Sequence, residues 1–214
     1  RTNSIQMWEN KLPKEAKVIL LAVSLVILFW FVAFWTPPLS QQDLISKIQK
    51  VDVDCTVYNE STYVFNNHGF KSYFPTKPTT EILDVDTVKA TNIFALDETK
   101  NILYAVLITE GEVSSTEYPE LMLASYFDSY LATSPTIINP KIIEKTRIDY
   151  NGHSAYEYKF YYNESTTPLI QQGIYFIEGN RMFKVAITYT HLNIGEVANE
   201  YLMFTSTFGT LIEK

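Results

Sequence analysis

The chain has 214 residues and a formal net charge of −7, with seven Gly against fifteen Tyr and thirteen Phe. Residues 1–50 carry six Lys and Arg against three Asp and Glu, whereas residues 51–214 carry eleven against twenty-one. An acidic region of that size repels phosphate backbones, which excludes nucleic acid as a partner. The abundance of aromatic residues excludes a disordered tail and favours one sheet-rich domain with a sizeable core.

The first predicted element is an apolar helix over residues 18–35. Residues 18–42 contain no charge, and the first eighteen are almost wholly apolar on every side. At about 1.5 Å rise per residue, eighteen residues span roughly 27 Å, close to the hydrocarbon thickness of a bilayer. The sequence therefore predicts a tail (1–17), a transmembrane helix (18–36) and, after Pro37-Pro38, a juxtamembrane linker or short helix (37–50).

Basic residues predict the orientation of this span. Four cations precede it, and the next cation after it is Lys47. The positive-inside rule then places the amino terminus in the cytoplasm, or in a mitochondrial matrix. Residues 51–214 are expected on the periplasmic or other extracytoplasmic side of an inner or cell membrane, or in an intermembrane space. The four preceding cations are Arg1, Lys11, Lys14 and Lys17.

The predicted span has two different halves. Small Ala22 and Ser24 permit close packing against another helix, because association in lipid depends on packing. The aromatic residues of the second half fit either such packing or anchoring at the lipid interface. The expected partners are other membrane-protein subunits and the lipid bilayer. These aromatic residues are Phe29, Trp30, Phe31, Phe34 and Trp35.

Residues 51–110 predict antiparallel strands. Residues 51–58 alternate apolar and polar, and residues 62–74 predict two short strands about the turn at 66–69. Residues 87–96 and 102–109 flank a polar turn and predict a hairpin. The second of these runs is apolar on both faces, which predicts a central strand.

The rest of the chain predicts two helices and two hairpins. Asn151-Gly152 favours a type I′ turn joining 142–149 to 154–162, and 170–177 is expected to pair with 182–190. Helical spacing predicts one helix over 114–134 and a closing helix near the carboxyl terminus. The predicted fold class is α+β: behind the transmembrane helix, residues 51–214 form a mostly antiparallel sheet packed with two helices as an α/β/α sandwich. The helical positions are Leu123, Phe127, Tyr130 and Leu131, then Val197, Tyr201, Phe204, Phe208 and Leu211.

Several short motifs in residues 62–212 resemble the PsbP-like superfamily. They are Gly69-Phe70 with Phe74-Pro75 and Pro78, then Gly152 with Ala155-Tyr156, then Arg181-Met182-Phe183, then a last helix near Phe208. That group includes the extrinsic PsbP subunits of photosystem II, Ran-binding relatives and many bacterial domains. The resemblance implies a non-catalytic, protein-binding domain. Lys77 stands where many photosynthetic members carry an aromatic residue, which argues against a photosystem role.

No nucleophile and base occur at a recognisable spacing. The sequence therefore predicts a protein that is not an enzyme and that binds no cofactor and no metal. His68, His153 and His191 lack the spacing of a helical zinc pair. The pairs Asp52/Asp54 and Asp84/Asp86 could hold a hard cation, although solvated strand edges explain them better. Cys55 has no partner in the chain for a disulfide and is expected to be a small buried hydrophobe.

Alternation places Tyr156, Tyr158, Phe160 and Tyr162 on one face of the sheet. These residues are core if a helix covers them; otherwise Tyr156, Tyr158 and Tyr162 offer a ligand platform. The leading hypothesis is a non-catalytic single-pass accessory or scaffold subunit that assists assembly or stability of a larger membrane complex. The alternative is a membrane-tethered binding module that captures a small ligand or lipid on the aromatic face.

Overall fold

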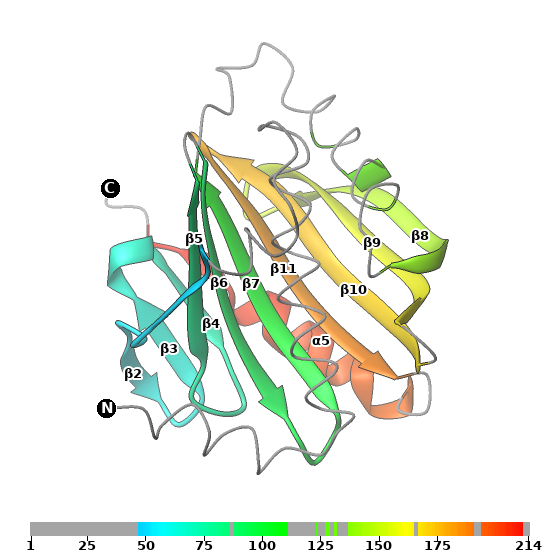
Figure 1. The fold of residues 1–214 in the computed structure, drawn as a ribbon, viewed down its shortest axis with the longest axis horizontal. Helices are drawn as coiled ribbons and strands as arrows, with labels where there is room; N and C mark the ends of the chain where they lie inside the picture. Colours follow the sequence, from blue (N-terminus) through cyan, green and yellow to red (C-terminus); the bar gives the residue numbers. More distant parts are fainter. Residues whose placement is uncertain are drawn as a thin grey trace.

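The computed structural model describes residues 47–85, 88–110, 123, 127, 128, 131, 137–164, 167–190 and 194–211. These residues form two antiparallel sheets and the helix α5 (Figure 1). The elements are β1 (Gln49–Val51), β2 (Thr56–Asn59), β3 (Thr62–Phe65), the 3-10 turn η1 (Asn66–His68), β4 (Phe70–Tyr73), β5 (Thr79–Val85), β6 (Val88–Asp97), β7 (Ile102–Glu110), β8 (Ile138–Tyr150), β9 (His153–Glu164), β10 (Thr167–Glu178), β11 (Arg181–Thr190), α5 (Ile194–Thr207) and β12 (Gly209–Thr210).

The large sheet has eight strands in the order β1-β5-β6-β7-β11-β10-β9-β8. Its local hairpins follow the turns expected from the sequence. Asn151 and Gly152 between β8 and β9 both have positive φ, as a type I′ turn requires. Strand β7 lies between β6 and β11, and its residues from Ile102 to Thr109 are buried. The three predicted hairpins and the central position of residues 102–109 are therefore confirmed.

The small sheet has four strands in the order β12-β4-β3-β2. Strands β3 and β4 are joined by η1 and by Gly69, whose φ of 67° lies in the left-handed region that glycine adopts without steric cost. The last strand, β12, pairs with β4 through Gly209 and Lys71. The carboxyl-terminal strand thus completes a sheet that was begun near the start of the described chain.

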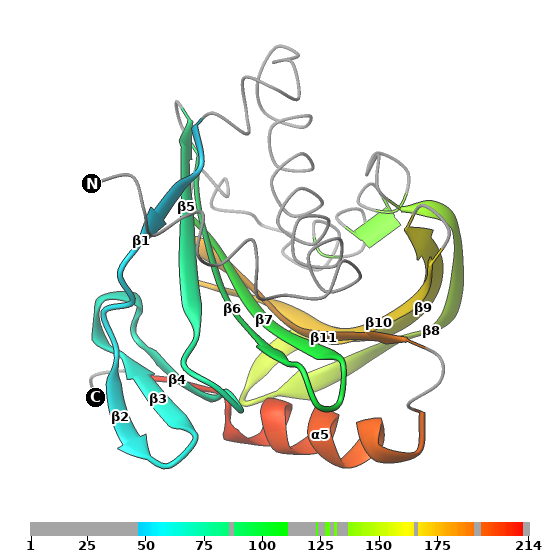
Figure 2. The same cartoon turned by 60° about the horizontal axis from the view of Figure 1, so that its bottom comes forward.

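The large sheet is curved, and both α5 and the small sheet lie on its convex side (Figure 2). A hydrophobic core fills the space between them. Phe204 of α5 is fully buried there, with its ring centroid 5.6 Å from that of Phe74 and 5.3 Å from that of Tyr104. Edge-to-face contacts of this kind add to the stabilisation gained by removing the rings from water.

Hydrogen bonds fix the position of α5 on this core. The hydroxyl of Tyr104 donates to Oε2 of Glu200 over 2.6 Å, and Nζ of Lys100 donates to Oε1 over 2.5 Å. At the next residue of the helix, the hydroxyl of Tyr201 donates to Oε1 of Glu157 over 2.7 Å. Burial and the hydrogen bond to Glu200 raise the pKa of Tyr104. Because these bonds join buried or half-buried groups, shifting the helix would leave charges unpaired.

The predicted fold class is wrong. The described residues are mostly antiparallel strand with α5 as the one complete helix, so an α/β/α sandwich with two packed helices is not formed by them. The physical reason lies in strand pairing: β2, β3 and β4 pair in succession, and β12 adds to β4, so that these strands form a separate small sheet. That sheet, together with α5, covers the convex face.

The predicted transmembrane helix is likewise not shown. No helix within the described ranges is long and apolar enough to cross a membrane. Residues 18–35, including Ala22, Ser24, Phe29, Trp30, Phe31, Phe34 and Trp35, lie outside those ranges. Of the predicted helix over 114–134, only Leu123, Phe127, Asp128 and Leu131 are described.

Candidate functional site

The concave face of the large sheet carries the aromatic residues singled out in the sequence. Tyr156, Tyr158, Phe160 and Tyr162 project from β9 on this side, and all but Tyr156 are almost completely buried. The ring of Phe127 lies 5.0 Å from that of Tyr158 and 5.8 Å from that of Tyr175. Tyr158, Phe160 and Tyr162 therefore belong to a packed cluster, which also contains Leu123, Leu131, Ile137, Leu169, Met182 and Ala186.

Tyr158 lies across the sheet because its cross-strand neighbour is a glycine. Gly173 is opposite Tyr158, and a Cβ at that position would come within 2.8 Å of the Tyr158 hydroxyl and 2.6 Å of the Val185 carbonyl oxygen. The hydroxyl donates to Oε1 of Gln171 over 3.1 Å, and Nε2 of Gln171 donates to Oγ1 of Thr188 over 3.1 Å. The missing side chain of Gly173 thus makes room for a buried hydrogen-bonded chain.

A buried lysine lies beside this network. Lys184 is in the middle of β11, opposite Leu107 of β7 and Tyr175 of β10. Its Nζ lies 5.7 Å from the centroid of the Tyr158 ring, within the range of a cation–π contact. Burial lowers the pKa of the Lys184 ammonium to about 7. The sequence analysis did not single out this residue, although a lone lysine within the apolar run 182–189 was a signal.

From Lys184, a row of cross-strand neighbours runs over the same face of the sheet to its β1 edge. Opposite pairs join Lys50 to Glu81, Glu81 to Asn92, and Asn92 to Leu107, on the same face as Lys184. Glu81, Asn92 and, on the next strand, Thr109 are 5%, 3% and 3% exposed. Within the described ranges, four of their polar atoms have no hydrogen-bond partner: Oε2 of Glu81, Oδ1 and Nδ2 of Asn92, and Oγ1 of Thr109. We call these three residues the polar cluster.

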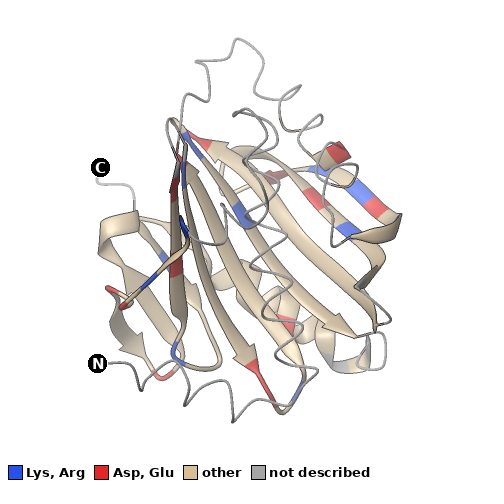
Figure 3. Ribbon diagram, in the orientation of Figure 1, with Lys and Arg blue, Asp and Glu red and all other residues tan. Residues whose placement is uncertain are grey.

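Strand β8 forms the opposite edge of the sheet, and its ribbon carries several charged residues (Figure 3). Ile138, Ile142 and Ile143 are 43%, 45% and 53% exposed on it. The register to β9 shifts between Ile138 and Lys141 and again between Ile142 and Glu144. From Glu144 onward the pairing is regular, and β8 is paired on one side only.

The remaining candidate residues are dispersed. His68 lies in η1, where its carbonyl accepts a bond of 2.7 Å from Arg181, and His153 begins β9. Asp52, Asp54 and Asp84 are exposed, while Asp86 and His191 fall outside the described residues. Burial raises the pKa of the half-buried Cys55 thiol. Within the described ranges, no group of three His, Cys, Asp or Glu side chains could hold a metal ion.

Comparison with solved structures gives the fold class: the fold is PsbP-like. The solution structure of cyanobacterial PsbP (CyanoP) from Synechocystis matches with a TM-score of 0.52 and 13% identity, over 72% of this chain and 95% of that chain. At this identity the match shows the fold alone. The predicted resemblance is confirmed to that extent.

Two other solved structures match with a TM-score of 0.40 each. One is a Pseudomonas aeruginosa protein of unknown function, with 12% identity over 62% of this chain and 90% of that chain. The other is LpqN, involved in cell envelope biogenesis of Mycobacterium tuberculosis, with 10% identity over 80% of this chain and 97% of that chain. No protein-family model matches the sequence, and no curated protein matches it either.

Proposed function

We propose that this PsbP-like domain is a non-catalytic protein-binding domain, an accessory or scaffold subunit of a larger complex that docks through strand β8. The observation that carries the proposal is the row of exposed Ile138, Ile142 and Ile143 on a thirteen-residue edge strand. Exposed apolar side chains on an unpaired edge favour association with another strand, which is why most proteins protect such edges.

The chemistry of β8 suits an added strand from a partner. An extended segment can pair with the regular stretch from Glu144 to Tyr150 through main-chain hydrogen bonds, and its side chains then give specificity. Lys145 and Arg147, opposite Tyr158 and Tyr156, share the concave side of β8. A partner segment with apolar residues near Ile142 therefore fits this edge best.

Paired serine substitutions on two edges test the proposal. Ile142→Ser with Ile143→Ser removes apolar surface from β8, whereas Val57→Ser with Tyr58→Ser removes it from the exposed edge strand β2 of the small sheet. Each variant is expressed in the source cells, and its assembly is measured by native gel and by crosslinking to the partner found with the unchanged protein. Circular dichroism checks that both variants fold.

The β8 variant is expected to run as free protein, while the β2 variant stays in the complex. Slower hydrogen exchange at the amides of residues 144–150 in the complex would support strand addition. Assembly of the β8 variant at full yield would contradict the proposal, and so would an unchanged protein that runs alone.

A further inference from the structure

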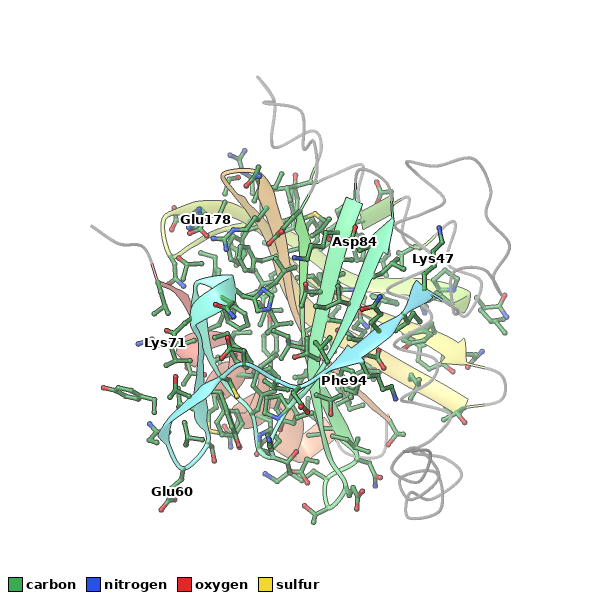
Figure 4. All side chains as sticks on the ribbon, turned by 60° about the vertical axis from the view of Figure 1, so that its left-hand side comes forward. Lys47, Glu60, Lys71, Asp84, Phe94 and Glu178 are labelled. Atoms are coloured by element: carbon green, nitrogen blue, oxygen red, sulfur yellow. The ribbon has the colours of Figure 1, made fainter. Side chains whose placement is uncertain are left out.

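The polar cluster lies far from β8, at the other side of the large sheet, and raises a separate question. Figure 4 looks onto the β1–β5 side of the molecule, where Asp84 on β5 and Phe94 on β6 mark the two ends of the strand pair that carries Glu81 and Asn92. Glu81 and Asn92 are directly opposite on neighbouring strands. Thr109 is two residues beyond Leu107, the partner of Asn92, and so faces the same side.

These three neighbouring side chains have buried polar atoms that make no hydrogen bond within the described ranges. More than nine tenths of each is buried, and four of their polar atoms have no hydrogen-bond partner among the residues that the structure describes. Buried polar groups in folded proteins are almost always paired, because leaving one unpaired forfeits the bonds that it made with water. Three such residues side by side on β5, β6 and β7 therefore indicate a site for an external polar group.

The chemistry of the cluster selects a cation that donates several hydrogen bonds. Oε2 of Glu81, Oδ1 of Asn92 and Oγ1 of Thr109 are acceptors on three successive strands. A buried carboxylate is best stabilised by a charged donor, and a guanidinium presents five N–H groups in one plane. Nδ2 of Asn92 remains to donate to an oxygen of the same ligand.

We propose that Glu81, Asn92 and Thr109 bind a small molecule with a guanidinium or ammonium group and a nearby carbonyl oxygen. Lys50 lies beside the site on the edge strand β1. Its side chain is 73% exposed, and its Nζ lies 3.7 Å from Oε1 of Glu81, beyond hydrogen-bonding distance. Lys50 therefore competes with the ligand for the carboxylate without satisfying it.

Calorimetric titration of the full chain with two matched probes tests this site. The first probe is 4-guanidinobutanamide, and the second is 4-ureidobutanamide, which has nearly the same shape but no charge. The first is expected to bind saturably and the second at least about tenfold more weakly, since a charge-assisted hydrogen bond is worth that much or more. Equal affinities, or no saturable binding of the first probe, would overturn the proposal and leave ordered water as the occupant.

Four variants identify the contacts. Glu81→Gln, which keeps the shape, should weaken binding of the charged probe about tenfold or more, and Thr109→Val should weaken it several-fold. Lys50→Met should tighten binding, because it removes the competing cation. Asp84→Asn, an exposed carboxylate on the same strand, is the control and should change affinity less than about twofold.

Glu81→Gln and Lys50→Met are expected to change the affinity in opposite directions, so the test stays decisive if one of them does not fold. Thermal unfolding without probe shows which variants are native. If Glu81→Gln is unfolded, unchanged or weaker binding by Lys50→Met still contradicts the proposal. An effect of Asp84→Asn as large as that of Glu81→Gln would show a general effect of charge and would likewise contradict it.

Discussion

Replacing Lys184 by Met should make the stability of the protein less dependent on pH. Lys184 is buried in the centre of the large sheet, and burial lowers the pKa of its ammonium from 10.5 to about 7. Met has a similar length and no charge, so Lys184→Met keeps the packing beside Tyr158 and removes the titration.

The sign follows from proton binding in the two states. Between pH 7 and 10.5 the unfolded chain keeps the lysine protonated while the folded chain has released its proton. The free energy of unfolding therefore rises with pH across this window. One pKa unit corresponds to about 1.4 kcal/mol. Between pH 7 and pH 9, the free energy of unfolding of the unchanged protein should therefore rise by roughly 2–3 kcal/mol relative to that of Lys184→Met. Below about pH 6 the difference between the two proteins should be constant.

Urea denaturation of the full chain at pH 6, 7, 8 and 9, followed by circular dichroism, measures this difference. Lys141→Met, at an exposed position of β8, is the matched control and should leave the pH dependence unchanged. Parallel pH profiles for the unchanged protein and Lys184→Met would refute the reasoning, because they would mean that folding leaves the pKa of this lysine unaltered.

Two further predictions concern packing on the two faces of the sheet. Phe204→Ala should lower the free energy of unfolding by about 3–5 kcal/mol, since a fully buried ring is lost; a loss below about 1 kcal/mol in urea denaturation would show that the convex core does not depend on it. Gly173→Ala should cost about 1–3 kcal/mol through the close contacts of the added Cβ, and combining it with Tyr158→Phe should recover part of that loss. Additive effects in the double variant, measured in the same way, would contradict the contact with the Tyr158 hydroxyl.

Local patterns in the sequence predicted the hairpins and the side to which their residues point. Asn151-Gly152 correctly predicted the turn between β8 and β9, and the alternation from Tyr156 to Tyr162 correctly predicted that these rings share one face. Pairing between distant strands left no such local sign. Strand β5, the pairing of β7 with β11 and the pairing of β4 with β12 depend on which apolar faces meet in the folded chain.

The end of α5 shows how a local competition overrides a periodic pattern. Helical spacing predicted that the closing helix reaches Leu211, yet α5 ends at Thr207 and Leu211 is exposed. The hydroxyls of Thr205 and Thr207 donate to the carbonyls of Tyr201 and Met203, each over 2.8 Å or less. Side-chain bonds of this kind compete with the helical backbone, and the chain then turns into β12.

The polar cluster could not be predicted from the sequence, for a different reason. Glu81, Asn92 and Thr109 are each a single polar residue in a largely apolar strand, and the sequence does not give the register of one strand against the next. Only the pairing of Glu81 with Asn92, and the position of Thr109 beside them, brings the three together. The same holds for Lys184, whose burial depends on strands β7 and β10 from distant parts of the chain.

The pairing of β12 with β4 has a consequence for the order in which the chain folds during synthesis. Until residues 208–210 have been synthesised, β4 has no neighbour on that side, and Phe70 lacks the ring of Phe208, which stacks on it at 5.3 Å in the finished fold. Contacts between residues that are far apart in the sequence form late, because a long loop must close first. The small sheet is therefore among the last parts of the fold to form, because its order β12-β4-β3-β2 joins residues 56–73 to residues 209–210.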